Sequence, residues 1–73
     1  MAKYNGHKNW NHWNVSLWIN GDESLYRFAK YCIEQTDTKD NAAMRFLRHV
    51  GEDNTPDGAP YSFSSVRAAM RDM

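Results

Sequence analysis

The chain has 73 residues, enough for one domain, and its nine basic and nine acidic side chains leave no formal net charge. This balance argues against a general nucleic-acid-binding protein, which usually carries a basic excess, and against an acidic DNA mimic. A single cysteine excludes an internal disulfide, and no apolar run reaches the ~20 residues that cross a bilayer, so we expect a soluble cytosolic protein.

The N-terminal third is rich in tryptophan and asparagine. Residues 1–8 contain the turn dipeptide Asn5-Gly6 and predict an irregular arm. Asn9 is of the residue type preferred at helix N-caps, so we place the first helical residue at Trp10. Asn20-Gly21 is a typical helix end. The pattern predicts a short first helix over residues 10–20.

The apolar residues of this helix fall on two faces. They are Trp10, Trp13 and Leu17 on one face and Val15, Trp18 and Ile19 on the next. Val15, Leu17 and Ile19 also alternate as in a strand, but the tryptophan spacing and the end signal favour a helix. We therefore expect this helix to be buried on much of its circumference, with Trp13 and Trp18 in the core and Trp10 nearest the surface.

Two amphipathic helices follow. Asp22 is expected to cap a helix over about residues 23–36, whose apolar stripe is Leu25, Phe28, Ala29, Cys32 and Ile33. Cys32 should therefore be a buried small hydrophobe. Thr38 or Asp37 should begin a third helix over residues 39–50, which ends at Gly51 and has the stripe Ala43, Phe46, Leu47 and Val50, with Met44 at its edge.

The last part of the chain is a loop followed by a helix. Residues 51–61 hold both prolines, and Pro56-Asp57-Gly58 is a turn signal. Ser62 or Ser64 should cap a helix that ends near Asp72 and turns Phe63, Val66, Ala69 and Met70 inward. The whole chain, residues 1–73, is thus predicted to be a single all-α domain, a compact bundle of three to four helices with an aromatic core.

No group of residues predicts catalysis. His7, His12, His49 and Cys32 lack the spacing of a zinc site, and Cys32 has no local signature of a nucleophile. The acidic residues of the 51–61 loop lack the alternation and the distal glutamate of a calcium loop. We therefore expect no catalytic residue, no metal and no cofactor, and predict that the protein is not an enzyme.

Two sets of residues are candidates for partner binding. The first is an arginine set, Arg45 and Arg48 on the third helix with Arg67 and Arg71 on the fourth, which would share one surface if these helices are neighbours. The second is an aromatic set, Trp10, Tyr26, Lys30 and Tyr31. The ordinary interpretation of the arginine set is two solvated helix faces, and that of the tryptophan cluster is a place in the core.

The segment Tyr4 to Tyr26 carries a recognisable order of residues: Tyr-Asn-Gly, Asn-Trp, Trp-Asn-Val, Leu-Trp-Ile, Asp-Glu and Leu-Tyr. It resembles a family of small proteins of phages and other mobile elements, without a settled molecular function, whose members read like YNGWxNYxTWNVxLWxxNDExLY. The resemblance covers about the first third of the chain. His7 stands where members often carry tryptophan, and Trp10 where they often carry tyrosine.

The resemblance implies a protein that a mobile element produces in the cytoplasm of a bacterial host. Small non-enzymatic proteins of this kind commonly bind a host protein, as anti-CRISPR and anti-restriction inhibitors do. Our first hypothesis is therefore a protein-interaction module that inhibits a host defence complex, such as a CRISPR-Cas effector, by binding and steric blockade, without a membrane partner. The alternatives are a nucleic-acid-associated regulator that uses the arginine set and a virion structural or assembly protein. A homodimer is compatible with the neutral charge.

Overall fold

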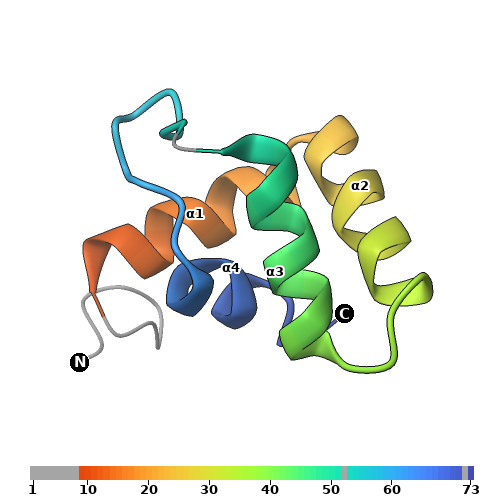
Figure 1. The fold of residues 1–73 in the computed structure, drawn as a ribbon. Helices are drawn as coiled ribbons and strands as arrows, with labels where there is room; N and C mark the ends of the chain where they lie inside the picture. The colour runs from red at the N-terminus through yellow and green to blue at the C-terminus, as the bar shows by residue number, and fades with distance from the viewer. Residues whose placement is uncertain (1–8, 52, 72) are drawn as a thin grey trace.

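The computed structural model describes residues 9–51, 53–71 and 73, and these residues form four α-helices (Figure 1). The helices are α1 (Trp10–Gly21), α2 (Glu23–Glu34), α3 (Lys39–Val50) and α4 (Phe63–Ala69). Within the described ranges the only strand-like pairing is an isolated antiparallel bridge between Asn54 and Pro60. The all-α prediction is confirmed, whereas the predicted arm over residues 1–8 lies outside the described residues.

Each helix begins at a polar side chain that accepts a hydrogen bond from the backbone N–H three residues further on. The caps are Asn9, Asp22, Thr38 and Ser62. At α4 the bond is reciprocal, because the backbone N–H of Ser62 donates to Ser65 Oγ at 3.0 Å, which completes a capping box. Ser62 therefore caps the last helix rather than Ser64, and Thr38 caps the third rather than Asp37.

Two helices are shorter than their apolar patterns predict. α2 ends at Glu34, and the Thr36 hydroxyl donates to the carbonyl of Cys32 at 2.7 Å just beyond its last turn. α4 ends at Ala69 rather than near residue 72. Side-chain hydrogen bonds to backbone carbonyls compete with helix propagation, which accounts for the early end of α2.

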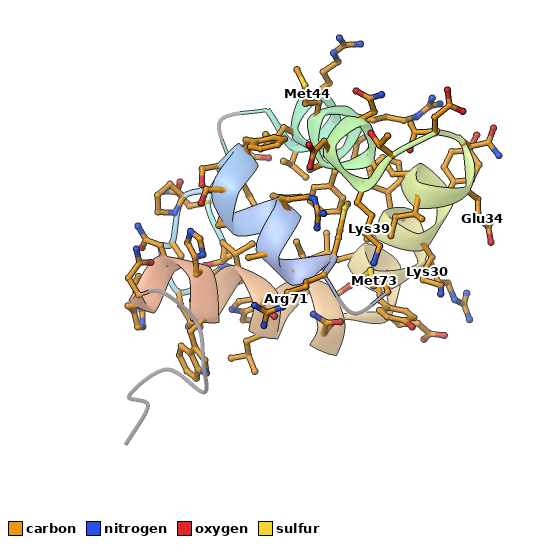
Figure 2. All side chains as sticks on the ribbon, turned by 90° about the horizontal axis from the view of Figure 1, so that it is seen from below. Lys30, Glu34, Lys39, Met44, Arg71 and Met73 are labelled. Carbon is orange, nitrogen blue, oxygen red and sulfur yellow. The ribbon has the colours of Figure 1, made fainter. Side chains whose placement is uncertain are left out.

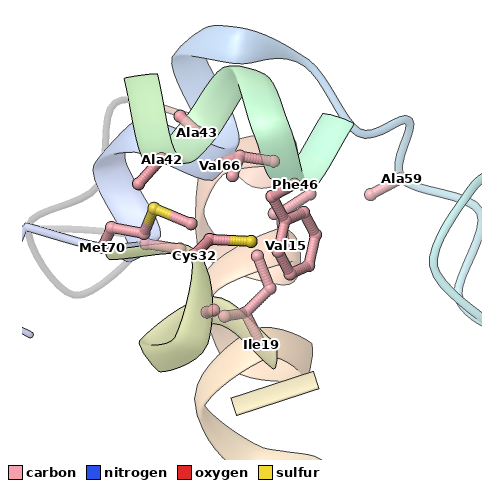
Figure 3. Close-up of a cluster of buried hydrophobic side chains, with 11 residues drawn as sticks. Val15, Ile19, Cys32, Ala42, Ala43, Phe46, Ala59, Val66 and Met70 are labelled. Atoms are coloured by element: carbon pink, nitrogen blue, oxygen red, sulfur yellow. The ribbon is translucent and has the colours of Figure 1, made fainter. Parts of the chain in front are cut away.

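The helices pack in a closed order, with α1 against α2, α2 against α3, α3 against α4, and α4 back against α1. Figure 1 shows α3 crossing in front of α4 while α1 runs behind both. The side chains buried between them are small and aliphatic around one central ring, that of Phe46 (Figure 3). Phe28 and Tyr61 flank this ring at centroid distances of 5.4 and 6.1 Å. Burial keeps Cys32 in the same cluster and raises the pKa of its thiol, against a smaller lowering by Arg45.

The prediction of a tryptophan core is wrong. α1 is covered only on the side that meets α2 and α4, so Val15 and Ile19 are buried, whereas Trp13 and Trp18 are half-buried. Leu17 is 50% exposed on the outer side of this helix. The aromatic part of the core comes instead from Phe46 and the rings beside it.

Candidate functional site

One side of α3 faces the core and the other side stands free of the other helices. Ala42, Ala43 and Phe46 are fully buried on the inner side. Met44 and Arg48 follow on the outer side, and Met44 is 50% exposed. An exposed unbranched apolar side chain in the middle of a helix marks this side for closer description.

An apolar depression lies between the outer side of α3 and the start of α4. It has a volume of about 510 Å³ and is lined by Met44, Leu47, Arg48 and Phe63. Phe63 is 43% exposed, although its spacing from Val66 and Met70 predicts an inward position. It is the first residue of α4, directly after the Ser62 cap, so its ring lines the depression instead of entering the core.

A second, more polar depression adjoins the first at the α2–α3 turn. Its volume is about 420 Å³, and its lining residues are Gln35, Thr36, Asp37, Asn41, Met44, Arg45 and Arg48. Met44 and Arg48 line both depressions, so the two are continuous along α3. We call the nine residues that line either depression the α3 surface.

The α3 surface carries a positive balance, with two guanidinium groups, Arg45 and Arg48, and one carboxylate, Asp37. Arg45 makes a cation–π contact with Tyr31 of α2, because its Cζ lies 5.7 Å from the centroid of the Tyr31 ring. The Tyr31 ring stacks in turn on Phe28 at 6.4 Å. The guanidinium of Arg45 is therefore oriented by an aromatic support that continues into the core.

The predicted arginine set is divided by the structure. Arg45 and Arg48 line one depression, but Arg67 does not, because its Nε donates to Asp40 Oδ1 at 2.7 Å. The backbone carbonyl of Arg71 accepts a hydrogen bond from Lys39 Nζ at 2.8 Å. Figure 2 shows Arg71, which lies beyond the end of α4, well apart from Met44, so neither Arg67 nor Arg71 adds to the α3 surface.

The predicted aromatic set is divided as well. Trp10, 38% exposed, stands at the start of α1, whereas Tyr26, Lys30 and Tyr31 are exposed on α2, which joins the opposite end of α1 (Figure 1). Trp10 therefore shares no continuous face with the other three. Their role in partner binding stays a prediction. Sequence reasoning missed Phe63, and it noted Met44 only at the edge of a stripe.

A second polar cluster fastens the loop after α3 to α1. Asp57 Oδ2 accepts hydrogen bonds from Asn14 Nδ2 and from Trp18 Nε1, each at 2.9 Å. Asn14 and Thr55 are both buried, and the Thr55 hydroxyl donates to Asn14 Oδ1 at 2.6 Å. We call Asn14, Trp18, Thr55 and Asp57 the polar clamp.

The polar clamp explains why Trp18 is not in the core. Its indole N–H donates to Asp57, which holds the Trp18 ring half-buried beside the loop. The hydrogen bonds from Asn14 and then Trp18 lower the pKa of Asp57. Each of the four side chains of the clamp has a protein partner, so their arrangement indicates a structural role in setting the path of the loop.

A further polar contact pairs a histidine with a serine hydroxyl. His12 Nε2 lies 2.8 Å from the Ser64 hydroxyl, which links α1 to the start of α4. Among the described residues no three His, Cys, Asp or Glu side chains converge as a metal site would require. None of the described helices is long and apolar enough to cross a membrane.

Comparison with known proteins places the chain among relatives of unknown role. The model of a family of unknown function, DUF7249, matches residues 1–73. The chain belongs to this family. No curated protein and no solved structure matches it. The DUF7249 match spans both the α3 surface and the polar clamp.

Proposed function

We propose that this DUF7249 protein is a protein-interaction module that binds its partner through the α3 surface. The observation that carries the proposal is the exposure of Met44 and Phe63 beside Arg45 and Arg48 over two continuous depressions. Interface cores are enriched in aromatic residues, methionine and arginine and depleted in lysine and glutamate. None of the nine residues of the α3 surface is a lysine or a glutamate.

The mode of action that we propose is steric blockade without chemistry. The α3 surface offers apolar area and guanidinium groups, which supply affinity and orientation. Among side chains that can act as a general base or nucleophile it contains only the Asp37 carboxylate and the Thr36 hydroxyl, and the Thr36 hydroxyl donates to the carbonyl of Cys32. We therefore propose that the protein is not an enzyme and acts by covering part of its partner.

For the biological setting we propose a mobile-element protein that inhibits a host defence complex in the bacterial cytoplasm, in the manner of an anti-CRISPR protein. Support comes from the resemblance of the Tyr4 to Tyr26 segment to small phage proteins and from the size of the chain. The partner in this proposal is a host protein or complex. This setting is independent of which surface makes the contact.

The test is an affinity purification of the tagged chain from bacteria with an active CRISPR-Cas or restriction system, with and without nuclease, joined to a plaque assay. Met44→Glu is the test variant and Leu17→Glu its control, because both side chains are 50% exposed within 12-residue helices. We expect a stoichiometric, nuclease-resistant partner that Met44→Glu loses and Leu17→Glu retains. Phage plaques should increase in cells that produce the wild-type chain or Leu17→Glu, and should not increase in cells that produce Met44→Glu.

Other outcomes would replace the proposal. Recovery of nucleic acid, or of proteins that nuclease releases, would favour a nucleic-acid-associated regulator. Recovery of phage structural proteins, or of the chain alone in large assemblies, would favour a virion assembly role. Equal partner loss in Met44→Glu and Leu17→Glu would show that the α3 surface has no special part in binding.

A further inference from the structure

The two halves of the α3 surface differ in chemistry, and the difference constrains what can bind there. The half nearer the end of α3 is apolar and is formed by Met44, Leu47 and Phe63. The half nearer the α2–α3 turn is polar and contains both guanidinium groups, with Asp37 at its rim. A matching partner must present apolar side chains next to negative charge on one face.

The secondary structure of the occupant follows from what this chain can offer. Addition of an extended strand needs an exposed sheet edge, and the described residues contain only one isolated bridge, between Asn54 and Pro60. Seating of an amphipathic helix needs a rigid apolar groove flanked by groups that fix its orientation. α3 and the start of α4 offer an open apolar depression beside two guanidinium groups, with Met44 and Arg48 lining both halves.

We propose that the occupant of the α3 surface is an acidic amphipathic helix of the partner protein. Its apolar side chains would cover Met44, Leu47 and Phe63, and its carboxylates would pair with Arg45 and Arg48. This inference rests on the proposed function and adds the chemistry of the partner. Arginine suits the pairing because its planar group can bind a carboxylate through two parallel hydrogen bonds.

Charge complementarity favours this occupant over a second copy of the chain. In a symmetric dimer whose two-fold axis passes through Met44 and Arg48, the Arg48 groups of the two copies would face each other. Like charges opposed across an interface disfavour the complex. Nucleic acid is disfavoured too, because Met44 and Phe63 offer no phosphate contact and the chain has no basic excess.

Arg45 is prepared for such a contact before any partner arrives. The Tyr31 ring beneath its guanidinium, at 5.7 Å, restricts the side chain without using its hydrogen-bond donors. A side chain already held in its bound orientation loses less conformational entropy on binding. Arg45 is therefore expected to contribute to affinity, and its charge to the rate of encounter.

The test uses the full chain, labelled for NMR, and three synthetic helical peptides of about 18 residues, long enough to be partly helical alone. All three share a leucine stripe at helical spacing, flanked by glutamate in the first peptide, lysine in the second and glutamine in the third. We expect the glutamate peptide to shift the signals of Met44 and Arg48 and to bind at least about tenfold more tightly than the lysine peptide. Added salt should weaken the binding of the glutamate peptide more than that of the other two peptides.

A charge-reversal variant makes the test independent of simple loss of folding. Arg45→Glu/Arg48→Glu should bind the lysine peptide in preference to the glutamate peptide and should do so with shifts at the Met44 signal, which only the folded chain can localise to the α3 surface. Equal binding of the three peptides, binding of none, or shifts confined to another face would overturn the acidic-helix partner. Dilution-dependent shifts at Met44 in the chain alone would identify a second copy instead.

Failure here is distinguishable from failure of the proposed function. If Met44→Glu loses the captured host protein while no peptide prefers the wild-type arginines, the α3 surface is the interface and the acidic partner is wrong. If Met44→Glu keeps the host protein, the proposed use of the α3 surface is itself wrong.

Discussion

The two sides of α3 show how one helix serves two purposes in a small domain. On the inner side Phe46 is fully buried between two flanking rings, and Ala42 and Ala43 let the neighbouring helices approach closely. On the outer side Met44 and the nearby Phe63 of α4 keep large apolar area in contact with water. Apolar area on the inner side stabilises the fold because it is buried, whereas apolar area on the outer side contributes free energy only when a partner covers it.

The largest expected effect is the difference in stability between variants at Phe46 and at Phe63. Phe46→Ala removes the central ring of the core and should lower the free energy of unfolding by about 3–5 kcal/mol. Phe63→Ala, on the exposed side, should cost about 1 kcal/mol or less. Urea denaturation followed by circular dichroism measures both.

If Phe46→Ala does not fold, a milder substitution at Phe46 can be compared with Phe63→Ala instead. Phe46→Leu should fold and lose about 1 kcal/mol, because it keeps an apolar side chain at the site. Equal losses for Phe46→Ala and Phe63→Ala would contradict the assignment of Phe46 to the core and of Phe63 to the exposed α3 surface.

The second effect concerns the polar clamp, which stabilises the fold without apolar burial. Asn14→Ala leaves the Thr55 hydroxyl without its acceptor and removes a donor to Asp57, so we expect a loss of about 2 kcal/mol. Amide hydrogen exchange should also accelerate in residues 53–61. Asn11→Ala is the control, because Asn11 is exposed on the same helix. Unchanged exchange in the loop would show that the clamp does not hold it.

A third, smaller effect is the acid sensitivity of the same clamp. Because the pKa of Asp57 is lower in the folded chain than in the unfolded one, its contribution to stability is present above the ordinary carboxyl range. It should disappear as the pH falls through the lowered pKa of the folded state. Asp57→Asn removes the titration but keeps an acceptor oxygen.

The measurement is the difference in stability between wild type and Asp57→Asn as a function of pH. It should be largest near neutral pH and close to zero in acid, since the other carboxyl groups titrate in both chains. A difference that stays constant with pH would contradict the role of the Asp57 charge.

The smallest expected effect is at the ion pair between α3 and α4. Asp40→Asn leaves Arg67 without its carboxylate, but Asp40 is 67% exposed and Arg67 36%, so water screens the pair and we expect a loss of only about 0.5 kcal/mol. The exposed Glu23–Arg27 pair within α2 is the comparison, and Glu23→Gln should cost no more. Thermal melts at low and high salt measure both variants. A loss comparable to that of Asn14→Ala would show that this pair is coupled to the core.

The helices and their first residues follow from local sequence. Asn9, Asp22, Thr38 and Ser62 cap their helices with backbone groups three residues away, so the signal and its partner lie within one turn. The burial of Cys32 likewise follows from the stripe of α2, because a strongly one-sided helix has one side to bury. Even the choice between Ser62 and Ser64 as the cap of α4 depended on hydrogen bonds between Ser62 and Ser65, which are three residues apart.

The candidate site was only half predictable. Arg45 and Arg48 lie one turn apart on the same helix, so sequence spacing alone indicated that they are neighbours. Phe63 shares its stripe with Val66 and Met70, and nothing local tells that the first turn of α4 would line a depression on α3. The separation of Arg67 from this pair depends on Asp40, which is 27 residues away.

The amino-acid sequence by itself thus determined the places of the four helices, the caps Asn9 and Asp22, the loop between α3 and α4, and the inner sides of α2 and α3. Only the tertiary structure decided which side of α1 is covered, why Asn14 is buried while Trp18 stays at the rim, and which arginines share a surface. The physical reason is the range of the interactions. Caps and periodicity act within one or two turns, whereas burial and the Asn14–Asp57 bond join residues 43 positions apart that meet only when the helices pack.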